Sequence, residues 1–325
     1  MAVKTVHLIS PGLFKAFHPS EIPVDAVVNS LLQKIVAKSN YLDQISVNPF
    51  YNYQACFPLA WFECLANDIV INTDQRVIYA QPMHFELKTD HVIARLIENS
   101  DADFSVLLQL LNDFYTDAGL SFIQLASGSI CCIFNRHHQV CFSPSYSVLG
   151  RDIKHFLPVG MDAPHWNSLF NEIQMLLHEK SSVLQGELSA LNALWFWGYS
   201  ELNESIDWPE FIIGSSSWVK GCCIQNNINN INLEDISELD TDAVTLIDES
   251  LIVAASTGDF SSWLKQLEKF NTQILGPLSK QLKNKSIEKI LLYDSPASAY
   301  ELKHSDRFKI FRKTPSIQKI CCTKS

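Results

Sequence analysis

The sequence predicts an α/β protein whose mostly parallel sheet is interrupted by an inserted α+β subdomain. Three observations lead to this prediction. Patterns of buried strands and amphipathic helices alternate at both ends of the chain. Between them, roughly over 78–185, a helix, three short strands and a second helix follow one another. Hydrophobic residues make up 47% and charged residues 18% of the 325 residues, a composition typical of chains that fold around a core.

The first part of the chain supplies elements of the parallel sheet. Val3–Ile9 is apolar, β-branched and ended by a Pro-Gly pair, so we expect a buried first strand. Asp25–Lys38 carries apolar residues at helical spacing. Phe57–Ala66 indicates a buried helix, and Asp68–Asn72 and Val77–Leu87 indicate strands.

The middle of the chain has the clearest pattern. Asp103–Tyr115 and His165–His178 predict amphipathic helices. Three short strand patterns lie between them, at 120–125, 129–135 and 139–143, and their spacing favours an antiparallel meander. His137 and His138 fall between the second and third strands, where we expect an exposed turn.

The last part returns to the α/β pattern. Strands are expected at Ala190–Gly198, Leu246–Ser256 and Ile287–Tyr293, and a long helix at Ser261–Leu282 is expected to be interrupted near its Gly-Pro pair. The tail from Thr314 is expected to be loose. We therefore expect 1–77 and 186–325 to form the α/β core, with 78–185 inserted into it as a cap.

Charge and cysteine usage limit the classes of partner and the compartment. The net charge of −10 opposes binding to nucleic acid or to an anionic membrane, and no apolar stretch approaches the ~18 residues of a membrane span. None of the nine cysteines forms a C-x-x-C pair, which predicts reduced, structural thiols in a cytoplasmic protein, with the exposed tail pair Cys321 and Cys322 as the expected exception. The expected partner is a small molecule or a protein.

Three segments are more specific than this general pattern. They are Gly150-Arg151-Asp152-Ile153, Phe170–His178 and Leu191–Gly198. In this order and spacing they resemble a bacterial family of regulatory proteins of RpfE type, whose members are often labelled phosphoglycerate mutases. The strand with Asn192, Trp195, Trp197 and Gly198 more distantly resembles archaeal-type cofactor-independent phosphoglycerate mutases. That resemblance implies an alkaline-phosphatase-like fold in which the insert caps the active edge of the sheet.

The resemblance also implies a serine nucleophile and two divalent metals, Mn or Mg, held by Asp and His ligands. This sequence departs from that pattern. His304 is the only histidine after His178. Where the relatives carry metal-binding loops, this sequence has Thr257–Phe260 and Asp294–Pro296, which contain no histidine. We therefore expect no catalytic residues, no metal and no cofactor, and a non-catalytic regulatory or binding role on a degenerate scaffold. The alternative is a phosphoglycerate mutase or related metal-dependent phosphotransferase with a rearranged site.

Five residues are candidates for ligand binding, each with a structural alternative: Arg151, Asp152, Asn192, Trp195 and Trp197. Arg151 and Asp152 either form a site pair or an internal ion pair. Asn192 either orients a ligand or caps its strand. The two tryptophans face opposite sides of the strand, so one is expected in the core and the other can line a cleft. A third interpretation is a protein-interaction role for the acidic surface or the loop at Gln225–Asn232.

Overall fold

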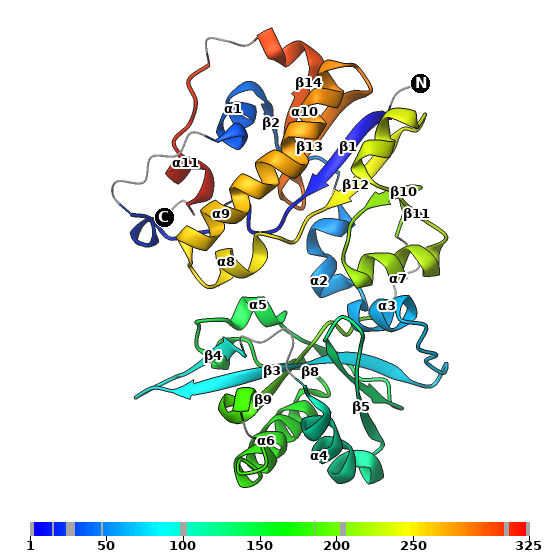
Figure 1. Cartoon of the computed structure of the whole chain (residues 1–325), viewed down its shortest axis with the longest axis vertical. Coiled ribbons are helices and arrows are strands. Elements are labelled where there is room, and N and C mark those ends of the chain that lie inside the picture. Colours follow the sequence, from blue (N-terminus) through cyan, green and yellow to red (C-terminus); the bar gives the residue numbers. More distant parts are fainter. Residues whose placement is uncertain are drawn as a thin grey trace. The chain divides into compact units, whose positions relative to one another are not determined.

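The computed structural model describes residues 3–14, 16–23, 30–46, 48–97, 103–184, 186–201, 206–308 and 312–322. The chain forms two compact units (Figure 1). Unit 1 comprises Met1–Asn52, Ile206–Ser216 and Asn226–Ser325, and unit 2 comprises Tyr53–Ser205 and Ser217–Gln225. Unit 1 is therefore assembled from three separate stretches of sequence.

Unit 1 is built on a seven-stranded sheet with the order β11-β10-β12-β1-β13-β14-β2. The first five strands in this order are parallel, and β14 runs antiparallel to both of its neighbours, β13 and β2. The strands are β1 (Val3–Ile9), β2 (Asn40–Leu42), β10 (Phe211–Ile213), β11 (Asn229–Asn230), β12 (Ala243–Ile247), β13 (Ile287–Ser295) and β14 (Ser298–Lys303). The predicted mostly parallel sheet is confirmed, and β1 has the bounds predicted for it.

The core of unit 1 lies between this sheet and its helices. Alternate residues of β1, such as Val6 and Leu8, pack with Trp263, Phe270 and other apolar helical residues. The helices are α1 (Leu31–Lys38), α8 (Ile252–Ser256), α9 (Phe260–Phe270), α10 (Gly276–Lys283) and α11 (Ile317–Cys321). The π-helical turn η7 (Asn271–Leu275) joins α9 to α10. Figure 1 shows both helices lying across the sheet.

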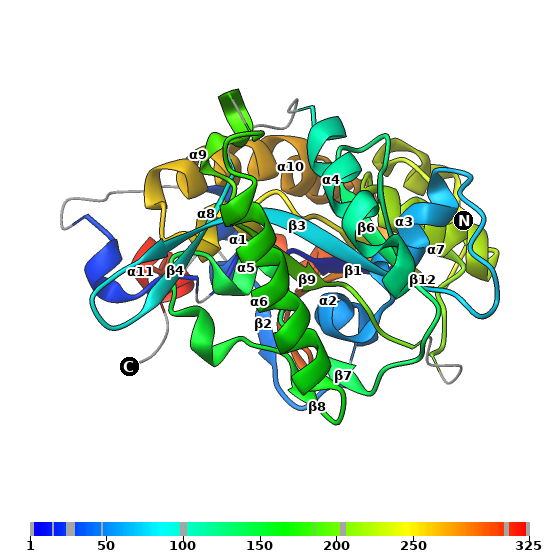
Figure 2. The same ribbon diagram turned by 90° about the horizontal axis from the view of Figure 1, so that it is seen from below.

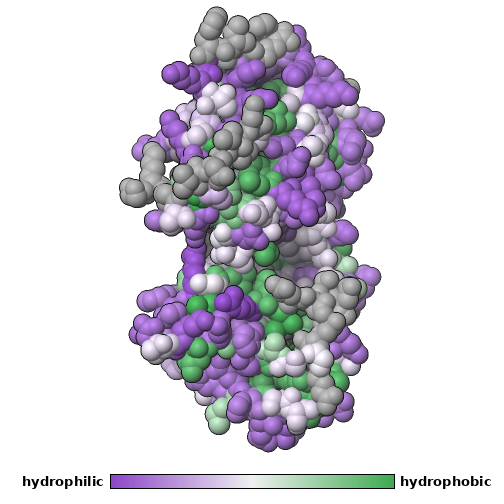
Figure 3. Space-filling model, turned by 60° about the vertical axis from the view of Figure 1, so that its left-hand side comes forward, coloured by the Kyte–Doolittle hydropathy of each residue, from purple (hydrophilic) through white to green (hydrophobic). Residues whose placement is uncertain are grey.

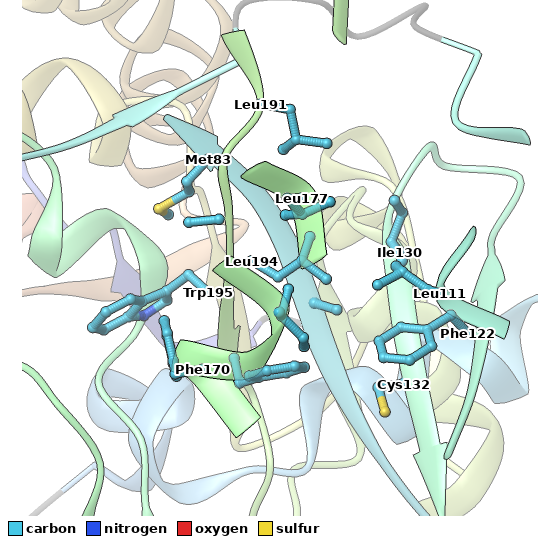
Figure 4. Packing of buried hydrophobic residues seen from close by; sticks show 14 of the residues in the cluster. Met83, Leu111, Phe122, Ile130, Cys132, Phe170, Leu177, Leu191, Leu194 and Trp195 are labelled. Atoms are coloured by element: carbon cyan, nitrogen blue, oxygen red, sulfur yellow. The ribbon is translucent and has the colours of Figure 1, made fainter. Parts of the chain in front are cut away.

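Unit 2 contains an antiparallel sheet with the order β4-β3-β6-β5, and β9 pairs with β3. The strands are β3 (Arg76–Leu87), β4 (Val92–Leu96), β5 (Leu120–Gln124), β6 (Ile130–Phe134) and β9 (Ala193–Trp197). Two predicted helices, α4 (Ser105–Tyr115) and α6 (Ala163–Glu179), cover one face of this sheet (Figures 1 and 2). Figure 4 shows Phe170 and Leu177 of α6 packed with Leu194 and Trp195 of β9.

The remaining elements are short. In unit 2 they are α2 (Tyr53–Cys56), α3 (Leu59–Ala66), α5 (Ser145–Val148), α7 (Ser217–Asn226), β7 (Val140–Cys141) and β8 (Val159–Gly160), together with the 3₁₀ turns η3 (Thr116–Ala118), η4 (Ile153–His155) and η5 (Gly186–Ala190). In unit 1 they are the 3₁₀ turns η1 (Pro19–Glu21), η2 (Pro49–Asn52), η6 (Leu233–Glu238) and η8 (His304–Phe308).

Two expectations about strand pairing need correction. The strand at 190–198 was expected in the α/β core, but β9 pairs with β3 from Tyr79 to Met83 and belongs to unit 2. The expected third strand of the meander, β7, pairs with β8 instead of β6, so only β5 and β6 form that part of the meander. The boundaries of the units therefore differ from the expected cap at 78–185.

Other expectations differ locally. Asp68–Asn72 forms a turn and an irregular segment, and Asp68 takes a φ of 57°, which a regular strand excludes. The expected strand at 246–256 ends at Ile247 and is followed by α8. The tail contains α11, because Ile317, Ile320 and Cys321 pack into the core of unit 1. The expected helix at 25–38 begins at Leu31, with Ser30 as its cap, and 24–29 lie outside the described residues.

Polar residues cover much of the surface in the view of Figure 3, and apolar residues show between them. Leu87 and Met161 are among the exposed large apolar side chains. Within the described ranges, no helix combines the length and apolar character that crossing a membrane requires.

Candidate functional site

The candidate site lies where three adjacent parallel strands of unit 1 end. Ile9 of β1 pairs with Ile247 of β12, and Leu8 pairs with Leu292 of β13. By continuation of this register, Asp248, Ser10 and Asp294 reach the same level at the carboxyl edge of the sheet. Ligands of open α/β sheets bind at this edge, outside the carboxyl ends of the strands.

Asp248 is held against the end of β1. Its backbone N–H donates to the carbonyl of Ile9 at 2.9 Å, and its Oδ2 accepts hydrogen bonds from Ser10 Oγ at 3.1 Å and Ser250 Oγ at 2.8 Å. Burial raises the pKa of Asp248, and the bonds from Ser250 and Ser10 partly oppose that rise. Ser10 is itself buried. The carboxyl of Asp248 is therefore a desolvated group that is linked to β1.

Asp294 is buried on the other side of β1, with 6% of its surface exposed. Its carboxylate accepts hydrogen bonds from Ser298 Oγ at 2.7 Å and from Tyr41 Oη at 3.2 Å. Tyr51 Oη donates to its backbone carbonyl at 2.9 Å. Burial, with a contribution from the charge of Asp294, raises the pKa of Tyr300 to about 12. This part of the edge is thus lined by hydroxyl groups around a carboxylate.

A tight turn after β1 fixes the position of Ser10. Gly12 has a φ of +82°, and a Cβ added there would lie 2.9 Å from Ala255 Cβ and 3.0 Å from the carbonyl oxygen of Leu251. Trp263 Nε1 donates to the carbonyl of Gly12 at 2.7 Å. Because the turn needs both a left-handed backbone and close contact with α8, glycine suits this position.

The nearest histidine in the sequence, His7, lies within β1 and not at its end. His7 Nδ1 is 2.9 Å from Tyr293 Oη, and the two rings stack with centroids 5.8 Å apart. Burial lowers the pKa of His7, and the charge of Lys289 lowers it further. We therefore expect His7 to be neutral at pH 7 and held by Tyr293.

The fold family implied by the sequence uses two divalent metals, and the side chains at this edge do not fit such a centre. The carboxylates of Asp248 and Asp294 each accept hydrogen bonds from two hydroxyl groups, which already occupy part of their capacity as acceptors. Asp259, from the expected metal loop, instead caps α9 by accepting from the backbone N–H of Ser262 at 2.9 Å. Among the described residues, no three His, Cys, Asp or Glu side chains form a group suited to a metal ion.

A cavity of about 510 Å³ opens at the opposite, amino edge of the same sheet. Its lining includes Lys4, Glu210, Asp240 and Asp242. Lys4 Nζ and Asp242 Oδ1 lie 2.5 Å apart and form an exposed ion pair. Exposed ion pairs contribute little to the stability of the folded protein. We consider the carboxyl edge the stronger candidate, because its acidic groups are desolvated and hydrogen-bonded.

Arg151 and Asp152 lie in unit 2, in the turn that leads into η4. Arg151 Cζ lies 6.0 Å from the centroid of the Phe156 ring. Asp152 Oδ1 accepts from the backbone N–H of Lys154 at 3.2 Å, and its Oδ2 lies 3.9 Å from His155 Nε2. In the part of the chain that the structure describes, no ion pair joins Arg151 to Asp152. Each side chain instead contacts a residue that follows it closely in the turn.

Asn192 lies just before β9 and bonds to the neighbouring strand. Its Oδ1 accepts from the backbone N–H of Phe85 at 2.6 Å, and its Nδ2 donates to the carbonyl of Phe85 at 2.9 Å. The amide therefore completes the pairing of β9 with β3.

The two tryptophans of β9 have different environments. Trp195 is 1% exposed, and its Nε1 donates to the carbonyl of Ser143 at 2.8 Å. Trp197 is partly exposed and packs on Tyr79, with ring centroids 4.8 Å apart. Its Nε1 has no hydrogen-bond partner among the described residues. Trp195 is therefore fully buried, whereas Trp197 is partly exposed and its indole Nε1 atom is itself buried.

The sequence did not single out the edge formed by Ser10, Asp248 and Asp294. Their signal is positional, because each lies at or just beyond the end of an apolar strand. The sequence alone does not show that β12 and β13 flank β1, so three residues far apart in the chain could not be recognised as neighbours.

Comparison with known proteins shows a likeness in fold. No protein-family model matches the sequence, and no curated protein matches it. The cofactor-independent phosphoglycerate mutase from Thermoplasma acidophilum has a TM-score of 0.37 at 12% identity, covering 93% of this chain and 89% of that one. The PH0037 protein from Pyrococcus horikoshii has a TM-score of 0.50 at 11% identity, covering 98% and 93%. The second likeness concerns the fold alone, and the first is too weak to support an argument.

Proposed function

We propose that this protein is a non-catalytic binding protein on a phosphoglycerate-mutase-like scaffold. Its ligand site would be the carboxyl edge of the unit 1 sheet. The observation that supports this proposal is the placement of Ser10 between Asp248 and Asp294, with hydroxyl groups donating to both carboxylates.

The side chains at this edge favour a particular class of ligand. Carboxylates accept hydrogen bonds, and hydroxyl groups can both donate and accept. A phosphate would need arginine, lysine or a metal beside it, whereas the described edge presents the two carboxylates of Asp248 and Asp294. We therefore propose a small, non-phosphorylated molecule that carries amine or hydroxyl groups.

The competing function is metal-dependent phosphoryl transfer. Such a reaction needs cations that neutralise the charge of the transferred group. An enzyme with a rearranged site would bring Asp and His side chains together at this edge. In the structure, His7 lies three positions before Ser10 and is bonded to Tyr293. The geometry therefore gives this alternative less support than it gives to binding.

Two measurements test the proposal. Calorimetric titration with Mn²⁺, combined with a turnover assay on 3-phosphoglycerate, should detect no metal-dependent activity. A thermal-shift screen of amines and polyols should find compounds whose stabilising effect disappears in Asp248→Asn and Asp294→Asn but persists in the amino-edge control Asp242→Asn. Stoichiometric Mn²⁺ binding with turnover that Asp248→Asn abolishes would contradict the proposal, as would stabilisation by 3-phosphoglycerate alone.

We retain Trp197, Arg151 and Asp152 as candidates for a separate ligand contact in unit 2. Trp197 has the best support, because its side chain is partly exposed while its buried indole Nε1 has no hydrogen-bond partner among the described residues. Asn192 and Trp195 have less support, because their polar groups are bonded to the backbone. A family assignment of RpfE type and a regulatory role remain predictions.

A further inference from the structure

A group of titratable side chains in unit 2 lies where the connection from β6 to β7 meets the start of α6. His138 belongs to that connection and is 4% exposed, although the sequence indicated an exposed turn. Its ring stacks on that of His165, with centroids 5.2 Å apart and an angle of 2° between the planes. It also packs edge-on against Trp166, with centroids 5.4 Å apart. A histidine is thus buried between a second histidine and an aromatic core.

Asp162 joins this connection to α6. Its Oδ2 accepts from the backbone N–H of Gln139 at 2.7 Å, and its own N–H donates to the carbonyl of Gln139 at 3.2 Å. The same carboxylate lies 3.8 Å from His138 Nδ1 and 3.9 Å from Arg136 Nη2. His138 Nδ1 makes no hydrogen bond to any residue that the structure describes. One carboxylate therefore holds the backbone of the connection and also faces two nitrogen-bearing side chains.

Tyr199, which follows β9, contacts the opposite side of the connection. Its Oη accepts from the backbone N–H of His138 at 3.3 Å and lies 3.1 Å from His137 Nδ1. His137 Nδ1 also lies 3.1 Å from Glu201 Oε1. Arg76, on β3, is the remaining charged group whose field reaches Tyr199. The connection is thus held from two elements, α6 and the segment after β9.

We propose that Arg136, His137, His138, Asp162 and His165 form a pH-sensitive latch, which holds the connection against α6 at neutral pH and releases it on acidification. We call this group the His138 latch. When its histidines are neutral, the latch contains one cation, Arg136, which lies beside the carboxylate of Asp162. A second carboxylate, that of Glu201, faces His137. When the histidines are protonated, four cations face these two carboxylates, and the cation on His138 is buried. Repulsion between the stacked His138 and His165 then favours an open connection in which water reaches the His138 ring, as it already reaches the exposed His165.

The direction of the pH effect follows from His138. Burial lowers the pKa of His138. The charges of three neighbours, His165, Arg136 and His137, lower this pKa further, and only the charge of Asp162 raises it. The open form, with an ordinary histidine pKa of about 6.5, therefore binds a proton more readily than the closed form. The closed form is fully favoured above that pH and loses stability as the pH falls below it.

Hydrogen exchange at the Gln139 amide provides a local test, because this amide donates to Asp162. In the full-length protein, its protection factor should fall by about tenfold or more between about pH 7.5 and about pH 5.5, while amides paired within β3 and β6 keep theirs. His165→Gln removes one cation from the stack and should reduce this loss. His178→Gln, at an exposed position of the same helix, is the matched control and should behave like the wild type.

Titration of the histidine rings by NMR gives an independent readout. In the wild type, the His138 ring should titrate below the ordinary histidine value of about 6.5, and in His165→Gln the pKa of His138 should rise. The latch is refuted when the protection of Gln139 does not change across this pH range, or when His138 titrates at or above the ordinary histidine value of about 6.5. Equal loss of protection in all amides at low pH would also contradict it, because it would indicate global unfolding.

Discussion

Asp248 is a residue of the candidate site whose acidity the surrounding structure alters. It is partly buried and follows a strand, and its hydrogen bonds come from serine hydroxyls with no cation among them. Burial raises its pKa, so the folded protein holds a proton on Asp248 more readily than the unfolded chain does. The ionised carboxylate therefore reduces stability at neutral pH, and this cost disappears once the group is protonated.

Replacing Asp248 by asparagine removes that cost. We expect Asp248→Asn to increase the free energy of unfolding at pH 7 by up to about 2 kcal/mol, and this gain should shrink as the pH approaches the ordinary aspartate value of about 4. Urea unfolding of both proteins across this range measures the difference. Asp242→Asn, at the exposed end of the same strand, should change stability by less than about 0.5 kcal/mol. A destabilising Asp248→Asn at pH 7 would show that the serine bonds outweigh burial.

At the scale of elements, the helix α7 shows how closely two segments of unit 2 approach each other. Gly221 lies in the middle of α7 and faces the backbone of α3. A Cβ added to Gly221 would lie 1.6 Å from the carbonyl oxygen of Phe62. Only a residue without a side chain allows this approach. A Cβ at this position would clash with backbone atoms of Phe62, which cannot rotate away as a side chain can.

We expect Gly221→Ala to destabilise unit 2 by about 3 kcal/mol or more, even though alanine favours a helix over glycine by about 1 kcal/mol. The clash outweighs the helix propensity. Thermal unfolding followed by circular dichroism provides the measurement. Lys220→Ala, one position earlier and exposed, is the control and should unfold like the wild type. Unchanged stability of Gly221→Ala would mean that α3 and α7 can separate without cost.

The elements that the sequence predicted well are those with a strong local pattern. The spacing of apolar residues located β1, α4 and α6 to within a few residues, because each buries one face or stripe of its own. The pairing partner of β9 was not predictable, because its apolar pattern fits any buried strand and its position is decided by Tyr79–Met83 of β3. For the same reason the neighbouring positions of Ser10, Asp248 and Asp294 were not predictable, because they depend on which strands flank β1.

At the scale of the whole molecule, the two units have separate cores that contain most of the cysteines. Cys132 and Cys321 are fully buried, and Cys223 nearly so. Burial raises the pKa of the Cys321 thiol to about 12 and that of Cys223 to about 11. Of the cysteines whose side chains the structure describes, Cys141 is the exposed one. This corrects the expectation that the tail pair is exposed and an exception to the structural thiols, since α11 packs Cys321 into unit 1 and Cys322 is only partly exposed.

We therefore expect a thiol-labelling reagent to modify Cys141 first in the native protein. Reactivity requires both access and a thiolate, and the buried thiols lack both. Mass spectrometry of briefly labelled protein identifies the modified position, and Cys141→Ser should remove the fast phase. The structure of unit 1 would be contradicted by labelling of Cys321 at a rate similar to that of Cys141.

The pairing of β1 has a consequence for biosynthesis. Thr5 pairs with Ala243 on one side and with Lys289 on the other, so both neighbours of β1 lie near the far end of the chain. A ribosome releases β1 long before it has made β12 or β13. The nascent chain therefore carries an apolar strand with two open edges while unit 2, whose residues end at Gln225, is completed. The sheet that forms the candidate site is the last part of the molecule to assemble, and until then both edges of its first strand are open to pairing with other chains.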